Sequence, residues 1–551
     1  MHGQVKTDKS AAVREKEKKQ KDAKLKVYRE GMTQIFERRR SGMKDWETMR
    51  FVGDVLSTNP DVYTLWNIRK EVLLQMIDDK SIDEPVKVGE GELRLTEICL
   101  KVNPKSYGAW HHRCWILEHF PELDLKRELA LCNKYLKLDA RNFHCWDYRR
   151  FITSKLGLSP EEELSYTMQK IEEDFSNYSS WHYRSKLLPL IHSDPAGIRP
   201  IKEEIHLREL DLVQNAAFTD PNDQSAWFYL RWLLGRLEPK LEIVMSFVCK
   251  EQSKMYIVFN TDASPSDSSI DVVSEHSGKW TTVNSLRDSS LWVSDLKTNS
   301  TEYNIKVTIS NETENVSLKA DAGFVWFRKP QFDPDVSPKL KALLVEQLET
   351  CNQLLELEPE SKWPLLTSVV FMKAIDTNQY REEIIERLRS LMKYDKYRSS
   401  YYADTLSKFL IEEEFKSNEL PTGSFSLKNL GLTSLYYTQY LARAERLDLS
   451  HNNLQRSLTK LQFAVNCSTL ILDDNDLTSL QNIPSLPQLI SLSVANNRLQ
   501  TAEEILKCID KLPSLQKINV AGNPFVEDDA AKQEFEKELK SLRPTLEITV
   551  D

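Results

Sequence analysis

The chain has 551 residues, a length that favours about three or four domains. Its formal net charge of −9 argues against general nucleic-acid binding, and its eight cysteines are scattered without a Cys-x-x-Cys pair, which argues against a disulfide framework or a metal site built by this chain alone. Residues 1–40 are charged and lack the apolar core of a signal peptide, and no run of roughly 18 apolar residues occurs. We therefore expect a cytoplasmic protein without a membrane span.

The first forty residues carry a charged segment with helical spacing. Lys and Arg alternate with Glu and Asp over residues 14–26, and Leu25, Tyr28, Met32 and Ile35 follow with the period of one helix face. This pattern predicts a helix that caps the next domain and turns a solvated face outward. A site for an anionic partner is the alternative.

A recurring frame of polar and aromatic residues occupies the next part of the chain. In its best copies, Asn or Asp is followed by Tyr or Phe four residues later, by Trp after seven and by Arg after ten. The fifth copy has Leu230 at the Arg position, and the sixth keeps only Glu358, Pro359 and Trp363. The frame residues expected at contacts between repeats or with a partner are Trp66, Arg69, Trp110, His111, Arg113, Trp146, Arg149, Trp181, Arg184 and Trp227.

The spacing of this frame predicts stacked helical hairpins. Successive copies lie about 35 to 46 residues apart, with apolar patterns of helical period before and after each, and such units bury their apolar faces only by stacking. We expect the Asn-Pro or Asp-Pro pair to end one helix and to cap the next. Tyr, Trp and Arg at intervals of three should share one face, with the guanidinium bonding carbonyl groups of a neighbouring helix. Aromatic residues in such repeats more often pack than bind ligands.

An insertion separates the fifth copy from the sixth. From residue 241 to about residue 329 the helical period gives way to short β-type runs, among them residues 255–259, 280–283, 291–293 and 323–327 and the strictly alternating 302–309. Seven or so strands at this spacing predict a small immunoglobulin-like β-sandwich. Cys249 is the only cysteine there, so the disulfide of true immunoglobulin domains cannot form.

The C-terminal part changes period again. Leu-x-Leu runs are each followed by an asparagine, at Asn452, Asn475, Asn497 and Asn523, which predicts leucine-rich repeats whose buried Asn satisfies the backbone of a turn. Such an arc binds a protein partner or serves as an appended stabiliser. The predicted organisation is a helical-hairpin solenoid at 1–240 and 338–422, an inserted sandwich at 241–337 and a leucine-rich repeat domain at 423–551. We expect catalysis to survive removal of either addition.

The copies around Trp110, Trp146 and Trp181 resemble the repeat of protein prenyltransferase alpha subunits, and the Trp-x2-Leu-Gly-x2-Tyr order of tetratricopeptide repeats is absent. The succession of helical repeats, immunoglobulin-like insert and leucine-rich repeats is similar to the alpha subunits of type II, or Rab, geranylgeranyltransferases. The alpha subunit shared by farnesyltransferase and the type I enzyme is similar only in the helical part.

This resemblance implies a heterodimer with a beta subunit that holds the catalytic zinc and the isoprenoid pocket. It also implies transfer of geranylgeranyl from geranylgeranyl diphosphate to C-terminal cysteines of Rab GTPases, which Rab escort protein presents. The chain itself shows neither a constellation of zinc ligands nor a Gly-rich phosphate loop. A noncatalytic scaffold or adaptor that keeps the repeat without the enzyme partner is the alternative.

The resemblance also implies candidate site residues. Lys105 and Tyr107 match a family motif that approaches the isoprenoid diphosphate, although a solvated lysine is the alternative. Five residues before the Trp, only Lys105 and Arg141 are cationic. His111 and His112 are adjacent on a helix, so their imidazoles point apart and favour packing or interface roles over metal binding. His2, next to a terminus, is a candidate ligand for the beta subunit's zinc, with an unbound terminus as the alternative.

Overall fold

The computed structural model describes residues 11–195, 197, 199–235, 240–283, 286–334, 336–417 and 423–550, and His2 lies outside these ranges. The chain divides into two compact units, residues 1–233 and 234–551. Among the described residues, no helix combines the length and the apolar composition that crossing a bilayer requires.

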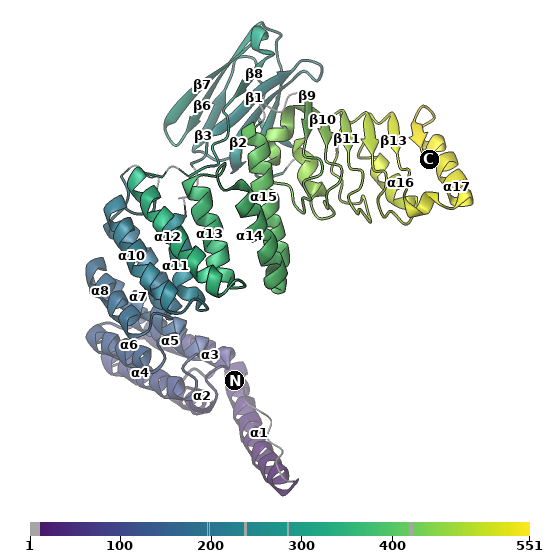
Figure 1. Cartoon of the computed structure of the whole chain (residues 1–551). Coiled ribbons are helices and arrows are strands. Elements are labelled where there is room, and N and C mark those ends of the chain that lie inside the picture. The colour runs from purple at the N-terminus through teal and green to yellow at the C-terminus, as the bar shows by residue number, and fades with distance from the viewer. Residues whose placement is uncertain are drawn as a thin grey trace. The chain divides into compact units, whose positions relative to one another are not determined.

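The first unit is a stack of helical hairpins (Figure 1). A long helix, α1 (Ala11–Arg40), packs Ile35 into the core of the hairpins, with Met32 and Phe36 beside it. The hairpins that follow are α2 (Trp46–Thr58) with α3 (Tyr63–Asp78), α4 (Pro85–Val102) with α5 (Tyr107–His119), α6 (Leu125–Leu138) with α7 (Phe143–Leu156), α8 (Pro160–Glu173) with α9 (Tyr178–Ile191), and α10 (Glu203–Thr219) with α11 (Gln224–Leu234).

The Asn or Asp of each frame closes the first helix of its hairpin and does not cap the second, so that part of the prediction is wrong. Asn103 closes α4, and the side chain that caps α5 is Ser106, which accepts the N–H of Ala109. Asn142 caps α7 in the same way. The reason is that Asn103 and Asp139 accept the N–H two residues on, which makes a separate turn before the second helix begins.

The frame tryptophans are buried and tie each turn to its helix. The indole N–H donates to the carbonyl oxygen six residues earlier, over 2.8 Å from Trp66 to Pro60, 2.8 Å from Trp110 to Pro104 and 2.9 Å from Trp146 to Ala140. The equivalent bonds of Trp181 and Trp227 measure 2.7 Å and 3.1 Å. Each ring therefore fills the core and satisfies its polar N–H locally.

The Tyr or Phe of the frame does not share this buried face. Tyr63, Tyr107, Phe143 and Tyr178 are 58%, 68%, 49% and 49% exposed. Each is the first residue of its helix, so its side chain lies at the end of the hairpin, where it stays largely exposed.

Each frame arginine forms a buried two-pronged ion pair with a glutamate on the first helix of the next hairpin. The pairs are Arg69 with Glu92, Arg113 with Glu128, Arg149 with Glu163, and Arg184 with Glu209, and all their N–O distances lie between 2.6 and 2.8 Å. A third guanidinium nitrogen reaches a carbonyl oxygen on the preceding helix in three cases, at Met49, Leu93 and Leu164. The pairs thus join consecutive hairpins.

Three of these glutamates accept a further hydrogen bond from the second helix of their own hairpin. Its donor lies two residues after the frame Trp of that hairpin. Tyr148 donates to Glu128 and Tyr229 to Glu209, both over 2.6 Å, whereas His112 takes this role at Glu92 over 2.9 Å. Burial alone would raise the pKa of Glu92, but Arg69 and His112 outweigh it and lower that pKa to about 2.

The second unit begins with strands and then adds two more hairpins. These are α12 (Pro338–Leu357) with α13 (Lys362–Ile375) and α14 (Arg381–Tyr394) with α15 (Ser399–Ser417). Because Glu358 closes α12, the Trp position of the sixth copy is held by Leu365, and Trp363 lies two residues too early. The hairpin α14–α15 is a further copy, in which Tyr402 holds the Trp position and donates to Asp395 over 3.0 Å.

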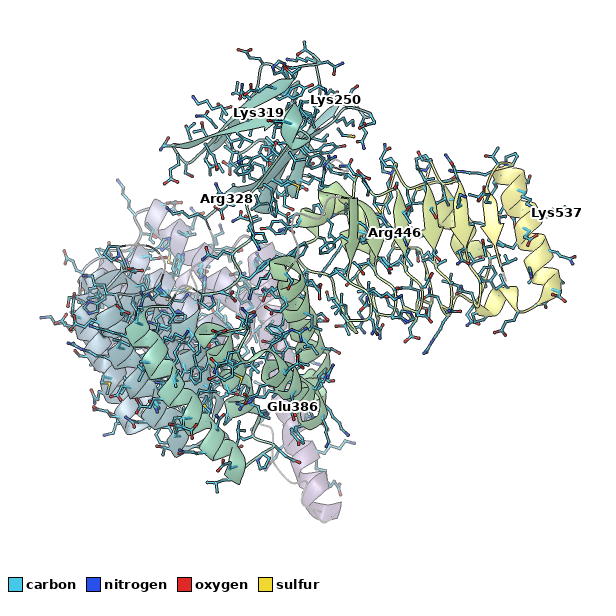
Figure 2. The ribbon with its side chains drawn as sticks, turned by 45° about the horizontal axis from the view of Figure 1, so that its top comes forward. Lys250, Lys319, Arg328, Glu386, Arg446 and Lys537 are labelled. Carbon is cyan, nitrogen blue, oxygen red and sulfur yellow. The ribbon has the colours of Figure 1, made fainter. Side chains whose placement is uncertain are left out.

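The inserted strands form two antiparallel sheets. The first sheet has the order β4-β5-β2-β1-β8 and the second β3-β6-β7, and Met255, Phe259, Trp292, Tyr303 and Val316 belong to their common core. Arg328, labelled in Figure 2, pairs with Glu242 beside the first sheet and with Glu314 of β7. The strands are β1 (Ile243–Cys249), β2 (Lys254–Ala263), β3 (Ile270–Val273), β4 (Thr281–Thr282), β5 (Ser289–Asp295), β6 (Glu302–Ile309), β7 (Glu312–Lys319) and β8 (Val325–Phe327).

The C-terminal part forms a parallel sheet in which strands pair in chain order from β9 to β14 (Figure 1). Buried Asn497 accepts the N–H of Leu477 and donates to the carbonyl oxygens of Leu472 and Val494, as expected for a turn-satisfying asparagine. The elements are β9 (Gly423–Ser426), β10 (Ala444–Asp448), β11 (Thr469–Ile471), β12 (Ser491–Ser493), α16 (Glu503–Ile509), β13 (Lys517–Asn519), α17 (Asp529–Leu542) and β14 (Glu547–Thr549).

Helix α15 packs against the start of this parallel sheet. The ring of Phe415 stacks on Phe425 with centroids 5.1 Å apart and lies 5.6 Å from Tyr440. Buried Glu412 accepts from Tyr437 over 2.7 Å and from Lys373 over 2.8 Å. The last hairpin and the parallel sheet therefore share a core that the sequence did not predict.

A neutralised glutamate in the first unit should destabilise it strongly. Glu128→Gln leaves the guanidinium of Arg113 buried without its counter-charge, so we expect unfolding to become easier by about 3–5 kcal/mol. The control is Glu90→Gln, which removes an exposed partner of Arg94 and should cost less than about 1 kcal/mol. Urea unfolding measures both variants, and equal midpoints would contradict the role given to the buried pair.

Loss of the contacts between α15 and the parallel sheet should destabilise the last hairpin. Phe415→Ala deletes a buried ring that packs on Phe425, so we expect a loss of about 3–5 kcal/mol and faster hydrogen exchange in α14 and α15. Truncation after residue 422 should accelerate exchange in the same helices. Tyr397→Ala, at a fully exposed ring, is the control. Unchanged exchange in α15 after truncation would show that the shared core is dispensable.

Candidate functional site

Lys105 lies in the turn that joins α4 to α5, and Tyr107 is the first residue of α5. Asn103 accepts the N–H of Lys105 over 3.0 Å, and the hydroxyl of Ser106 donates to the carbonyl oxygen of Pro60 in the preceding turn over 3.1 Å. A Cβ at Gly108 would lie 2.5 Å from the ring of Trp66, so only glycine fits there without movement. These contacts fix the turn from both sides.

Both candidate side chains are exposed at the edge of the first unit that the turns between the two helices of each hairpin form. The side chain of Lys105 is 61% exposed, and its Nζ lies 3.2 Å from Oδ2 of Asp139 in the next turn. The ring of Tyr107 meets His144 edge-on with centroids 4.2 Å apart and lies 6.1 Å from Phe143. An exposed ammonium and a phenol at one turn can together contact an anionic ligand.

Arg141 has an equivalent position one hairpin later. Its side chain is 60% exposed and its Nη2 lies 3.6 Å from Oδ2 of Asp174. The structure thus places both cationic frame residues in the same surroundings, and the choice of Lys105 stays a prediction that depends on the resemblance.

The two neighbouring histidines lie in different surroundings. His112 is fully buried against Glu92, whereas Nδ1 of His111 lies 3.0 Å from Nζ of Lys70. Burial lowers the pKa of both Lys70 and His111, and the charge of Lys70 lowers that of His111 further. Among the described residues, no three His, Cys, Asp or Glu side chains come together in a group that could hold a metal ion.

Exposed aromatic rings recur near the starts of the second helices of the first unit and form what we call the aromatic row. It comprises the four rings at the starts of α3, α5, α7 and α9, and Phe228 of α11, which is 36% exposed. Tyr107 contacts Phe143, and Tyr178 lies 6.2 Å from Phe228. Large aromatic residues gathered on a surface are characteristic of protein interfaces.

The frame arginines act in a network that sequence reasoning found only in part. Their partners Glu92, Glu128, Glu163 and Glu209 were missed. The available signal was the position of each glutamate within a buried helical stripe, as in Glu128, Cys132 and Leu136 of α6. A glutamate in the apolar stripe of a helix needs a buried cation, and the frame arginines supply one.

Comparison with known proteins identifies the repeat. The family described as "Protein prenyltransferase alpha subunit repeat" matches residues 90–120, 125–156, 160–191 and 206–237. These ranges follow the hairpins from α4 to α11.

The whole chain is also similar to curated proteins. It is 37% identical to "Geranylgeranyl transferase type-2 subunit alpha" of Bos taurus, over 99% of this chain and 100% of that protein. The protein of the same name from Homo sapiens gives 37% over the same shares. "Geranylgeranyl transferase type-2 subunit alpha 2" of Arabidopsis thaliana is 27% identical over 82% of each chain. The chain therefore belongs to the family of geranylgeranyl transferase type-2 alpha subunits.

Proposed function

We propose that this chain is the alpha subunit of a heterodimer that transfers geranylgeranyl from geranylgeranyl diphosphate to C-terminal cysteines of Rab GTPases, which Rab escort protein presents. The observation that carries this proposal is similarity over nearly the whole chain to type-2 alpha subunits, additions included. The exposed aromatic row of the first unit supports a large partner, the beta subunit. We assign the enzyme to the cytoplasm.

Zinc is proposed as a cofactor held by the beta subunit. The described residues of this chain offer no group of three ligands, so they do not fit a zinc site of their own. Bound to its partner, the metal would keep the attacking cysteine of the substrate as a thiolate. His2 is the only residue of this chain that we propose as a ligand, in trans.

The finer assignment of the additions belongs to the same proposal. Two packed antiparallel sheets inserted between hairpins support an immunoglobulin-like sandwich. A parallel sheet in chain order, with buried asparagines in its turns, supports a leucine-rich repeat arc. We propose that the arc serves as a protein-binding surface.

Lys105 and Tyr107 are proposed to contact the diphosphate. As the bond from the isoprenyl carbon to the diphosphate lengthens, negative charge grows on the phosphate oxygens. The ammonium of Lys105 and the hydroxyl of Tyr107, held at one turn, stabilise that charge more in the transition state than in the ground state. Their exposure in this subunit leaves both side chains accessible to a ligand carried by a partner.

Substitution of Lys105 tests this assignment. Lys105→Ala should lower the single-turnover rate of the heterodimer by on the order of tenfold to a thousandfold, the range for losing one electrostatic partner of the transition state. Heterodimer formation and zinc content should not change. Arg141→Ala is the matched control. An unchanged rate in Lys105→Ala beside a collapsed rate in Arg141→Ala would move the contact to the next hairpin, and no loss in either would make both residues structural.

Substitution of His2 tests the proposed ligand in trans. A displaceable ligand competes with the substrate thiolate for the metal, so His2→Ala should leave the prenylation rate unchanged or raise it. Steady-state rates at limiting protein substrate measure this competition. A large loss of activity would rule out a displaceable ligand.

A further inference from the structure

Side chains in the turns of the first unit form contacts that link each turn to the preceding one. In the turns after α4, α6 and α8, the Asn or Asp that closes the first helix accepts the backbone N–H two residues on through Oδ1. The distances are 3.0 Å from Lys105 to Asn103, 3.1 Å from Arg141 to Asp139 and 3.0 Å from Ser176 to Asp174. One terminal atom of each side chain is therefore committed to its own turn.

The other terminal atom reaches back to the preceding turn, and its chemistry matches what it meets there. Nδ2 of Asn103 donates to the carboxylate of Asp61 over 2.8 Å. Oδ2 of Asp139 lies 3.2 Å from the ammonium of Lys105, and Oδ2 of Asp174 lies 3.6 Å from the guanidinium of Arg141. Of these three contacts, the first pairs an amide with a carboxylate, and the other two pair a carboxylate with a cation.

The pair of Lys105 with Asp139 is weak enough to exchange. The two side chains are 61% and 39% exposed, and an ion pair in such surroundings contributes little because water and salt screen it. A diphosphate carries several negative charges, whereas Asp139 carries one. A diphosphate brought to this place would therefore attract the ammonium more strongly than Asp139 does, and the need to break the ion pair would oppose its binding.

We propose that Asp139 is the resident counter-ion of Lys105, which an incoming diphosphate displaces. This inference rests on the proposed function. Asp139 keeps the ammonium at the edge in the absence of ligand, and its backbone turn holds it there while the lysine changes partner. Asp139 stands where the preceding turn has Asn103. Its carboxylate therefore affects the affinity for the diphosphate and also holds the backbone of its own turn.

The test is Asp139→Asn in the heterodimer. Asparagine keeps Oδ1 for the turn but faces Lys105 with an amide that cannot pair with it. We expect geranylgeranyl diphosphate and inorganic pyrophosphate to bind about two- to fivefold more tightly, because the exposed pair no longer has to break. The rate at saturating diphosphate should stay within about twofold. Unchanged or weaker binding of both probes would overturn the proposal.

Two further variants make the result specific. Asp174→Asn releases Arg141 in the same way and should leave both affinities unchanged, and an equal gain there would reduce the effect to general electrostatics. The double variant Lys105→Ala, Asp139→Asn should bind both probes as Lys105→Ala does, because Asp139 acts through the lysine. A gain from Asp139→Asn that persists without Lys105 would overturn the proposal.

The single variant Lys105→Ala separates this inference from the proposed function. If Lys105→Ala changes neither binding nor rate, the assignment of Lys105 fails and the inference fails with it. If Lys105→Ala loses activity while Asp139→Asn gains no affinity, Lys105 keeps its role and only the counter-ion is wrong. Thermal unfolding followed by circular dichroism shows that each variant is folded.

Discussion

The buried pair of arginine and glutamate between consecutive hairpins is the interaction on which the first unit depends. Two charges removed from water cost more than their attraction returns unless every hydrogen-bonding group is satisfied. Arg113 meets this condition through both oxygens of Glu128, the carbonyl of Leu93 and the hydroxyl of Thr96, and Tyr148 bonds Glu128 from the next helix. Because these bonds join four consecutive helices, from α4 to α7, they set the register of one hairpin on the next.

The position of the candidate site follows from that register. Trp110 fixes the turn of its own hairpin through Pro104, and Ser106 bonds the carbonyl of Pro60 in the preceding turn. With the hairpins in register, successive turns lie within reach of one another at one edge. This is why the ammonium of Lys105 meets Asp139, which lies 34 residues further along the chain. A surface contact too weak to order itself is ordered by the core beneath it.

The sequence predicted the features that depend on rare residue types. Tryptophan and arginine in a fixed frame revealed the hairpins, and asparagines after Leu-x-Leu runs revealed the turns of the parallel sheet. Among the inserted strands, β6 was the clearest because its buried and exposed residues alternate, whereas β1, buried along its whole length, was not named as a run. The hairpin α14–α15 was missed because Tyr402 replaces the tryptophan. The sequence did not show that Asp139 lies beside Lys105 and Asp174 beside Arg141, because nothing within one turn indicates which residue of the next turn its side chains meet.

The decay of the frame has a physical counterpart in the second unit. Leu365 and Ser368 replace the Trp and Arg of the sixth copy, and Tyr402 and Thr405 replace those of the next. There the link between hairpins is Lys373 of α13 with Glu412 of α15, and Glu412 also accepts the hydroxyl of Tyr437 from the parallel-sheet region. Because Phe415 packs on Phe425 at the same place, the last hairpins obtain from an appended domain the contacts that earlier hairpins obtain from the repeat. The frame is free to decay where other contacts hold the helices together.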